Sequence, residues 1–125
     1  DGADNTYTGT YSSRDGRYTK IGNTVYASFQ LIATNDIEAG GLTGTSSLHI
    51  SGLPYANNSQ HFSGGHITNF QSNGRNMNSV RLTISRGGTK MFFRDYNNTT
   101  ETSVNVNEVN GSSTLFYGYV IYTTS

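Results

Sequence analysis

Residues 18–33, YTKIGNTVYASFQLIA, carry the clearest strand pattern in the chain. In the second half of this stretch, apolar side chains occupy alternate positions: Val25, Ala27, Phe29 and Leu31. A period of two predicts a strand with one buried face. Gly22 and Asn23 precede it, and because both residue types tolerate positive φ, they predict a hairpin turn back to residues 18–21. We expect the other strands to pack against this hairpin.

Short β-rich runs separated by turn residues fill the rest of the chain. Strands are expected at residues 6–11, 47–51, 66–71, 80–85, 91–93, 102–109 and 114–123. Tight turns are expected at residues 15–16, 73–74, 87–88 and 110–111, and longer loops at residues 35–44 and 56–65. No stretch keeps a helical period for more than one turn. The chain is therefore predicted to be all-β, a single domain over residues 1–125 built as an antiparallel, jelly-roll-like β-sandwich.

The composition excludes several classes of partner and chemistry. Hydrophobic residues make up 33% of the chain, below the roughly 45–50% of typical globular domains, so the nine tyrosines and six phenylalanines must supply much of the buried area. Eight basic residues balance eight acidic ones and are scattered singly, so no nucleic-acid partner is expected. No apolar run approaches the ~18 residues of a membrane span, so no membrane insertion is expected. The absence of cysteine excludes disulfides and thiol chemistry.

Residues that bind metals or catalyse reactions are few and poorly spaced for either role. The spacing of His49, His61 and His66 matches no common metal-site pattern, although a threefold axis would bring three copies of one histidine together. Asp36 and Glu38 share a glycine-rich loop, where they are solvated, paired for glycoside hydrolysis, or ligands for calcium. No local pattern activates a serine hydroxyl. The chain is therefore predicted to act without catalysis, resident metal or cofactor.

Two loops combine aromatic rings with amides in the way that sugar recognition requires. Flat ring faces stack on the C–H groups of a sugar, and planar amide, carboxylate and guanidinium groups bond its hydroxyls. Both kinds of group occur in residues 55–62 and 94–98, whose candidate glycan-binding residues are Tyr55, Asn57, Asn58, His61, Arg94, Asp95, Tyr96, Asn97 and Asn98. The alternative is that Tyr55 and Tyr96 anchor their loops to the core while the amides form turns.

Two motifs link the chain to a known family. Residues 18–25, YTKIGNTV, are followed by residues 48–55, LHISGLPY. With these motifs in this order and spacing, the chain resembles the C-terminal domains of bacteriophage tail fibres and related virion appendage proteins, in which a Y-T-K-I-G-N-x-V hairpin precedes an L-x-I-x-G-L-P-[FY] segment. More loosely, residues 115–122, LFYGYVIY, resemble the last strand of trimeric C1q- and TNF-like jelly rolls.

The resemblance implies a location and a task for the domain. It implies an extracellular domain of a virion, the C-terminal part of a longer fibre protein, at the tip of a homotrimeric fibre. There it would contact a host cell-surface polysaccharide or outer-membrane protein. The family's motifs are structural, so they imply no binding residue. The ring content gives trimerisation a separate physical reason, because a small sandwich interior does not easily hold so many rings.

Three other functions fit the same pattern. A monomeric carbohydrate-binding module or lectin would bind glycans through the same loops but would not form a trimer. A glycan-cleaving tip domain would place two carboxylates roughly 5–9.5 Å apart in a cleft, with Asp36 and Glu38 as the candidates. A purely structural capsid or fibre plug would bind no host cells.

Overall fold

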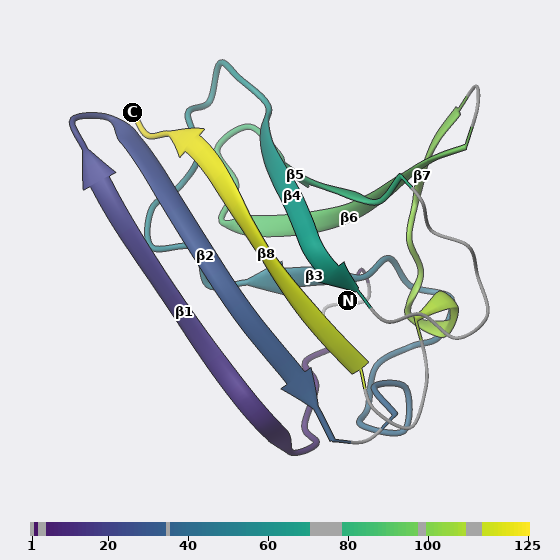
Figure 1. Ribbon diagram of the computed structural model, residues 1–125. Helices are drawn as coiled ribbons and strands as arrows, with labels where there is room; N and C mark the ends of the chain where they lie inside the picture. Colours follow the sequence, from purple (N-terminus) through teal and green to yellow (C-terminus); the bar gives the residue numbers. More distant parts are fainter. Residues whose placement is uncertain (1, 3–4, 35, 71–78, 98–99, 110–113) are drawn as a thin grey trace.

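The structure, a computed structural model shown in Figure 1, describes residues 2, 5–34, 36–70, 79–97, 100–109 and 114–125. In these residues the chain forms eight β-strands and one short 3-10 helix. In chain order they are β1 (Tyr11–Ile21), β2 (Thr24–Ala33), β3 (His49–Ser51), β4 (Ser63–Phe70), β5 (Arg81–Ile84), β6 (Lys90–Asn97), β7 (Thr100–Ser103), η1 (Val106–Glu108) and β8 (Thr114–Thr123). Nothing helical in the described residues is long and apolar enough to cross a membrane. The predicted all-β, jelly-roll-like fold class is confirmed.

The strands form one curled antiparallel sheet that is open on one side. Its order is β1-β2-β8-β4-β5-β6-β3, and β7 pairs with β6. In Figure 1, β1, β2, β8 and β4 make the front layer, and β5, β6 and β3 lie behind them. The layers are joined where β4 pairs with β5, so the sheet is a half-barrel, or a sandwich closed along one edge. β1 and β3 are the two ends of the sheet, and no pairing joins them in the described part of the chain.

The predicted central hairpin is confirmed. Gly22 takes the positive φ, 57°, that the turn between β1 and β2 requires. β2 then lies between β1 and β8, and all ten of its residues pair with β8. Its alternate side chains face the core, where Val25 is fully buried. The second predicted hairpin, β5–β6, turns at Gly87, while the turns expected at residues 73–74 and 110–111 lie outside the described residues.

The turn predicted at Asp15 and Gly16 is wrong, as is the strand expected to end at Tyr11. β1 begins at Tyr11 and continues through both turn residues, with Asp15 opposite Gln30 and Gly16 opposite Phe29. β2 is ten residues long and starts at a tight turn. It therefore offers β1 a continuous partner, which outweighs the local turn preference of Asp-Gly. β1 is a long edge strand as a result.

The strand predicted at residues 102–109 is wrong in its second half. β7 ends at Ser103, and Val106–Glu108 form a 3-10 turn. The Glu108 carboxylate accepts a hydrogen bond from the Asn105 backbone N–H, 2.8 Å away, and so closes the turn. The valines of this stretch are nevertheless buried. The alternation of these valines in the sequence indicated that they are buried. A turn that packs on the core buries its side chains just as a strand does.

β4 begins at Ser63, inside the loop expected at residues 56–65. Two consecutive glycines at its start suggested a loop, but they lie where β4 passes close to β5 and β8. A Cβ atom on Gly65 would lie 1.9 Å from the Tyr119 carbonyl oxygen, so only glycine fits at this position. The glycines therefore mark close packing of strands.

The core lies between the two layers and is rich in rings. Phe93 and Phe116 have their ring centroids 5.1 Å apart, and Phe70 lies 5.4 Å from Phe116. Tyr122 of β8 is also buried. Such rings each remove roughly 150–250 Å² from water, which compensates for the low hydrophobic fraction of the chain.

Candidate functional site

The two loops predicted to bind glycans lie at opposite ends of β6. Residues 55–62 pack beside its start, where the Asn57 backbone N–H donates to the Gly88 carbonyl oxygen, 2.9 Å away. Tyr96 lies near the other end of the strand. At ~3.3 Å per residue, the strand from Lys90 to Tyr96 spans about 20 Å. The two loops of one chain therefore do not form a single site.

Asn57 is a structural residue, which corrects the prediction that it contacts a glycan. It is only 1% exposed. Its amide nitrogen donates to the carbonyl oxygens of His61, Ile84 and Ser85, at 2.7, 3.3 and 3.2 Å. Its Oδ1 atom accepts from the Ser63 hydroxyl at 2.8 Å. The side chain thus ties the loop to β4 and β5, and it has no surface to offer a ligand.

The other residues of this loop differ in their exposure. Asn58 shapes the turn, because its Oδ1 atom accepts from the Gln60 backbone N–H at 2.8 Å. Its own backbone N–H donates to the Thr123 carbonyl oxygen at 2.7 Å, which fixes the loop to the end of β8. Tyr55 and His61 have exposed side chains. These two candidates are therefore accessible to a ligand.

Arg94 and Tyr96 belong to a charged network on β5, β6 and β7. Arg94 Nε lies 3.8 Å from the Glu101 carboxylate, and the Arg81 guanidinium lies 3.5 Å from the same group. Arg81 also lies over the Tyr96 ring, 5.2 Å from its centre. These contacts link the side chains of β5, β6 and β7 at the end of β6 where Tyr96 lies. They leave the Tyr96 ring partly exposed.

Three further candidates at this end of β6 are Asp95, Asn97 and Asn98. Asp95 is 5% exposed, which corrects the prediction that its carboxylate contacts a ligand. The side chain of Asn97 and the whole of Asn98 lie outside the described residues.

Tyr55 meets two side chains of β1 that the sequence pattern did not single out. The Tyr55 and Tyr18 rings are edge to face, with centroids 5.8 Å apart and an interplanar angle of 82°. A side-chain hydrogen bond to Tyr55 raises the pKa of Tyr18 above its ordinary value. Lys20 completes the group, here called the Tyr18–Tyr55 cluster, with Nζ 5.4 Å from the centre of the Tyr55 ring. The Tyr55 backbone N–H donates to the Tyr122 hydroxyl at 3.3 Å and so fixes the cluster to β8.

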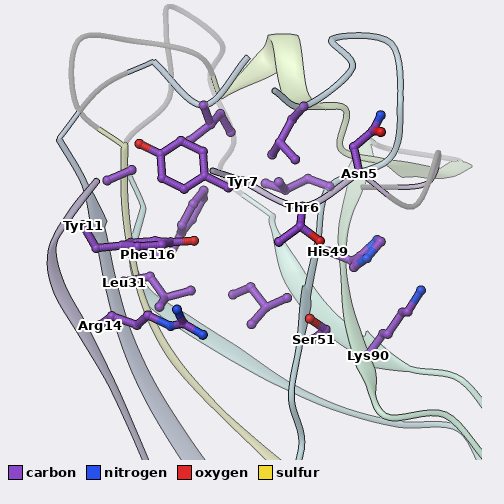
Figure 2. A pocket seen from close by; sticks show the side chains of 15 residues that line it. Asn5, Thr6, Tyr7, Tyr11, Arg14, Leu31, His49, Ser51, Lys90 and Phe116 are labelled. Atoms are coloured by element: carbon purple, nitrogen blue, oxygen red, sulfur yellow. The ribbon is translucent and has the colours of Figure 1, made fainter. Parts of the chain in front are cut away.

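A groove follows the open side of the half-barrel, between the unpaired edges of β1 and β3. We call it the β1–β3 groove. Its inner part is a pocket of about 290 Å³ beside Tyr11, shown in Figure 2. Its outer part is a hollow of about 420 Å³ that passes residues 51–54 and reaches Tyr18. The two parts adjoin each other, since they share four lining residues: Arg14, Leu31, Ile50 and Ser51.

The groove exists because β1 contributes few apolar side chains to the core. The positions of β1 opposite the core-facing residues of β2 are occupied by Arg14, Gly16, Tyr18 and Lys20. Beneath them the floor is apolar, with Phe29 and Leu31 from β2 and Met91 from β6. A polar and aromatic wall therefore stands above an apolar floor, which is the mixture of surfaces found in small-molecule sites.

In the inner pocket, Arg14 and Tyr11 reach inward from β1 while His49 and Lys90 lie on the opposite wall (Figure 2). The Arg14 guanidinium carbon lies 5.6 Å from the centre of the Tyr11 ring, a cation–π contact that orients the guanidinium group. Partial burial raises the pKa of Tyr11 above its ordinary value, against the opposing effect of the Arg14 charge. The Tyr11 hydroxyl is therefore a neutral donor and acceptor at physiological pH.

The acidic loop considered for calcium binding or glycan cleavage is organised by Asp36. Its Oδ1 atom accepts from the backbone N–H groups of Glu38 and Ala39, at 2.8 and 3.0 Å, and closes a turn. Within the described ranges, no three histidine or acidic side chains come together as a metal site. The Asp36 carboxylate thus has a local structural role.

Comparison of the chain with protein-family models, with curated proteins and with solved structures found no match. Function is therefore inferred from the geometry of the groove, and the family expected from the two sequence motifs stays a prediction. Sequence reasoning missed Arg14, Tyr18 and Lys20 because they lie on a strand and not in a polar loop. The sequence could have indicated them, because they occupy even-numbered positions of β1 that pair with the alternating apolar residues of β2.

Proposed function

We propose that this domain attaches a virion to its host by holding a cell-surface glycan in the β1–β3 groove, without catalysis. The observation that carries the proposal is the Tyr18–Tyr55 cluster, in which two exposed rings and a lysine adjoin an apolar-floored groove. The C–H faces of a sugar stack on such rings, and its hydroxyls bond to charged and hydroxyl side chains. One surface thus offers both kinds of contact.

The shape of the groove suits an extended ligand. The inner pocket, the outer hollow and the Tyr18–Tyr55 cluster follow one another along the gap between β1 and β3. Both are edge strands of the described sheet, so each leaves backbone N–H and C=O groups without a strand partner on this side. These groups add hydrogen bonds for the hydroxyls of successive sugars.

We also propose that three copies assemble through the outer face of β2 and β8. Tyr26 of β2 and Tyr119 of β8 stack with ring centroids 5.6 Å apart. Ile121, opposite Tyr26 in the sheet, is 51% exposed. In a single chain this apolar row faces water, and a symmetric interface would remove it from water.

The proposed trimer and the proposed ligand use different sides of the sheet. The groove lies on the concave side, which carries the core, while Tyr26, Tyr119 and Ile121 lie on the convex side. A trimer through the convex side therefore leaves three grooves open. Weak binding in each groove would gain strength from simultaneous contact with one cell surface.

Adsorption of the purified domain to a panel of bacterial cells tests this function. We expect binding to at least one strain, with loss of binding after periodate oxidation of the surface glycans. Loss only after protease treatment would point to an outer-membrane protein as receptor. Shortening of the bound glycan would show catalysis, and failure to bind any strain would favour a structural plug. Each of the last three outcomes contradicts the proposal.

A further inference from the structure

The inner pocket of the β1–β3 groove is lined by a cation from β1, Arg14. Arg14 reaches into it (Figure 2), and its guanidinium group contacts the Tyr11 ring. In the part of the chain that the structure describes, no carboxylate lines this pocket and none pairs with Arg14. Lys90 lies on the opposite wall. Because the whole chain has a formal net charge of zero, an arginine that no described carboxylate neutralises is a local feature that favours an anion.

The acid next to Arg14 in the sequence pairs with another arginine. The Asp15 carboxylate lies 3.3 Å from Nε of Arg17, and both side chains are exposed. Within the described ranges, a ligand anion therefore does not have to displace an ion pair from Arg14. Among the described residues, hydration of the guanidinium group and its contact with the Tyr11 ring compete with such an anion.

The walls of the pocket suit a ring better than a small inorganic ion. Rings of Tyr7, Tyr11 and Phe116 line it, together with apolar side chains such as Leu31 and Ile50. A hydrated ion gains little from such surfaces, whereas the C–H faces of a sugar pack against them. The volume of about 290 Å³ is just below the roughly 300–1,000 Å³ of small-molecule sites. The pocket thus suits one sugar unit.

We propose that the inner pocket takes an acidic sugar of the host glycan, such as a uronic or sialic acid unit, whose carboxylate pairs with Arg14. The planar guanidinium group matches a carboxylate through two parallel hydrogen bonds. The ring of the sugar packs against Tyr11 and Leu31. This inference rests on the glycan-binding function proposed above and names the class of sugar that the groove selects.

A glycan array tests the inference when it presents uronate- and sialate-containing oligosaccharides beside their carboxyl-reduced forms. We expect the wild-type domain to bind at least one acidic glycan about tenfold more tightly than its reduced form, because a charged hydrogen-bonded pair is lost on reduction. Arg14→Gln should bring this ratio close to one, and Arg14→Lys should keep part of it. Arg86→Gln is the matched control, since it removes the same charge from outside the groove and should keep the full ratio.

The possible outcomes separate this inference from the proposed function. Equal binding of acidic and reduced glycans would overturn the inference and leave glycan binding intact. An acidic preference that persists in Arg14→Gln would overturn it as well. Competition by sodium acetate as strong as that by sodium glucuronate would reveal a simple anion site and also contradict it. Failure to bind any glycan would contradict the proposed function itself.

Discussion

The Tyr18 ring of β1 and the Tyr55 ring, which follows β3 in the chain, meet edge to face with their centroids 5.8 Å apart. β1 and β3 are the two ends of the curled sheet and are not paired with each other in the described residues. The ring contact therefore spans the gap between the two ends of the sheet. It builds an exposed aromatic surface beside the groove from two segments that are distant in sequence.

Removal of either ring is expected to weaken glycan binding without unfolding the domain. Tyr18→Ala and Tyr55→Ala should each raise the Kd for a glycan selected on the array about 5- to 10-fold, because an aromatic stacking contact contributes roughly 1 kcal/mol. Isothermal titration calorimetry measures the change in Kd. Thermal unfolding of the same variants checks that the fold is intact.

Tyr96→Ala is the matched control for this prediction. Tyr96 is an exposed tyrosine like Tyr55, but it lies at the far end of β6. We expect its replacement to leave the Kd unchanged. A loss of affinity in Tyr96→Ala as large as that in Tyr55→Ala would contradict the placement of the site in the groove.

Asn57→Ala is expected to lower the free energy of unfolding by about 2–3 kcal/mol, because buried carbonyl groups lose their donor. The variant leaves the His61, Ile84 and Ser85 carbonyl oxygens without the amide nitrogen that bonds them. Asn58→Ala, which removes one exposed hydrogen bond to Gln60, should cost less than about 1 kcal/mol. Urea unfolding measures both variants, and equal losses would show that Asn57 has no special structural role.

The fold class could be predicted from the sequence because its strongest signals are local. The alternation in β2 and the turn at Gly22 need no knowledge of distant residues, and both predictions are confirmed. The predicted turn at Asp15 and Gly16 failed because a neighbouring strand, and not the local sequence, sets the conformation there. The need for glycine at position 65 could not be predicted locally either, because it comes from the close approach of β8.

The candidate site was harder to predict because the role of a side chain depends on the face it occupies. Asn57 and Tyr55 lie two positions apart in one polar loop, yet one is buried and the other is exposed. Nothing in the local composition separates them. Arg14 and Tyr18 border the groove only because β1 lies at one end of the sheet, and strand order is a property of the whole fold.

The stability of the domain is expected to fall above about pH 10 partly through Tyr122. Burial raises the pKa of its hydroxyl above the ordinary value, and the hydrogen bond from the Tyr55 backbone N–H only partly opposes this. The folded state thus holds this proton more tightly than the unfolded chain does. The contribution of Tyr122 is complete below the unfolded pKa and is lost as the pH rises through the higher folded pKa.

Tyr122→Phe tests this pH dependence because it removes the titrating hydroxyl and keeps the ring. Between pH 8 and about pH 10.5, the free energy of unfolding should fall less in the variant than in the wild type. At pH 8 the variant should be less stable by about 1 kcal/mol, since the Tyr55 N–H loses its acceptor. Identical alkaline losses in the two proteins would show that Tyr122 is not responsible.

Assembly through the convex face is expected to depend on Ile121. Ile121→Asp should reduce the mass measured by light scattering from three chains to one, because a charge at a closed apolar interface is costly. Circular dichroism should remain unchanged, since the residue is exposed in the single chain. Phe62→Asp, at an exposed apolar residue of the 55–62 loop, should keep the trimer. A single-chain mass for the wild type would contradict the trimer at once.

The most direct test of the groove as the binding site is nuclear magnetic resonance mapping of backbone amides during titration with a glycan selected on the array. We expect the largest shifts in β1 from Arg14 to Tyr18 and in residues 51–55, with smaller shifts on the inner face of β2. Shifts that instead gather around Arg94 and Tyr96, or on the convex face at Tyr26 and Ile121, would show that the β1–β3 groove does not hold the ligand.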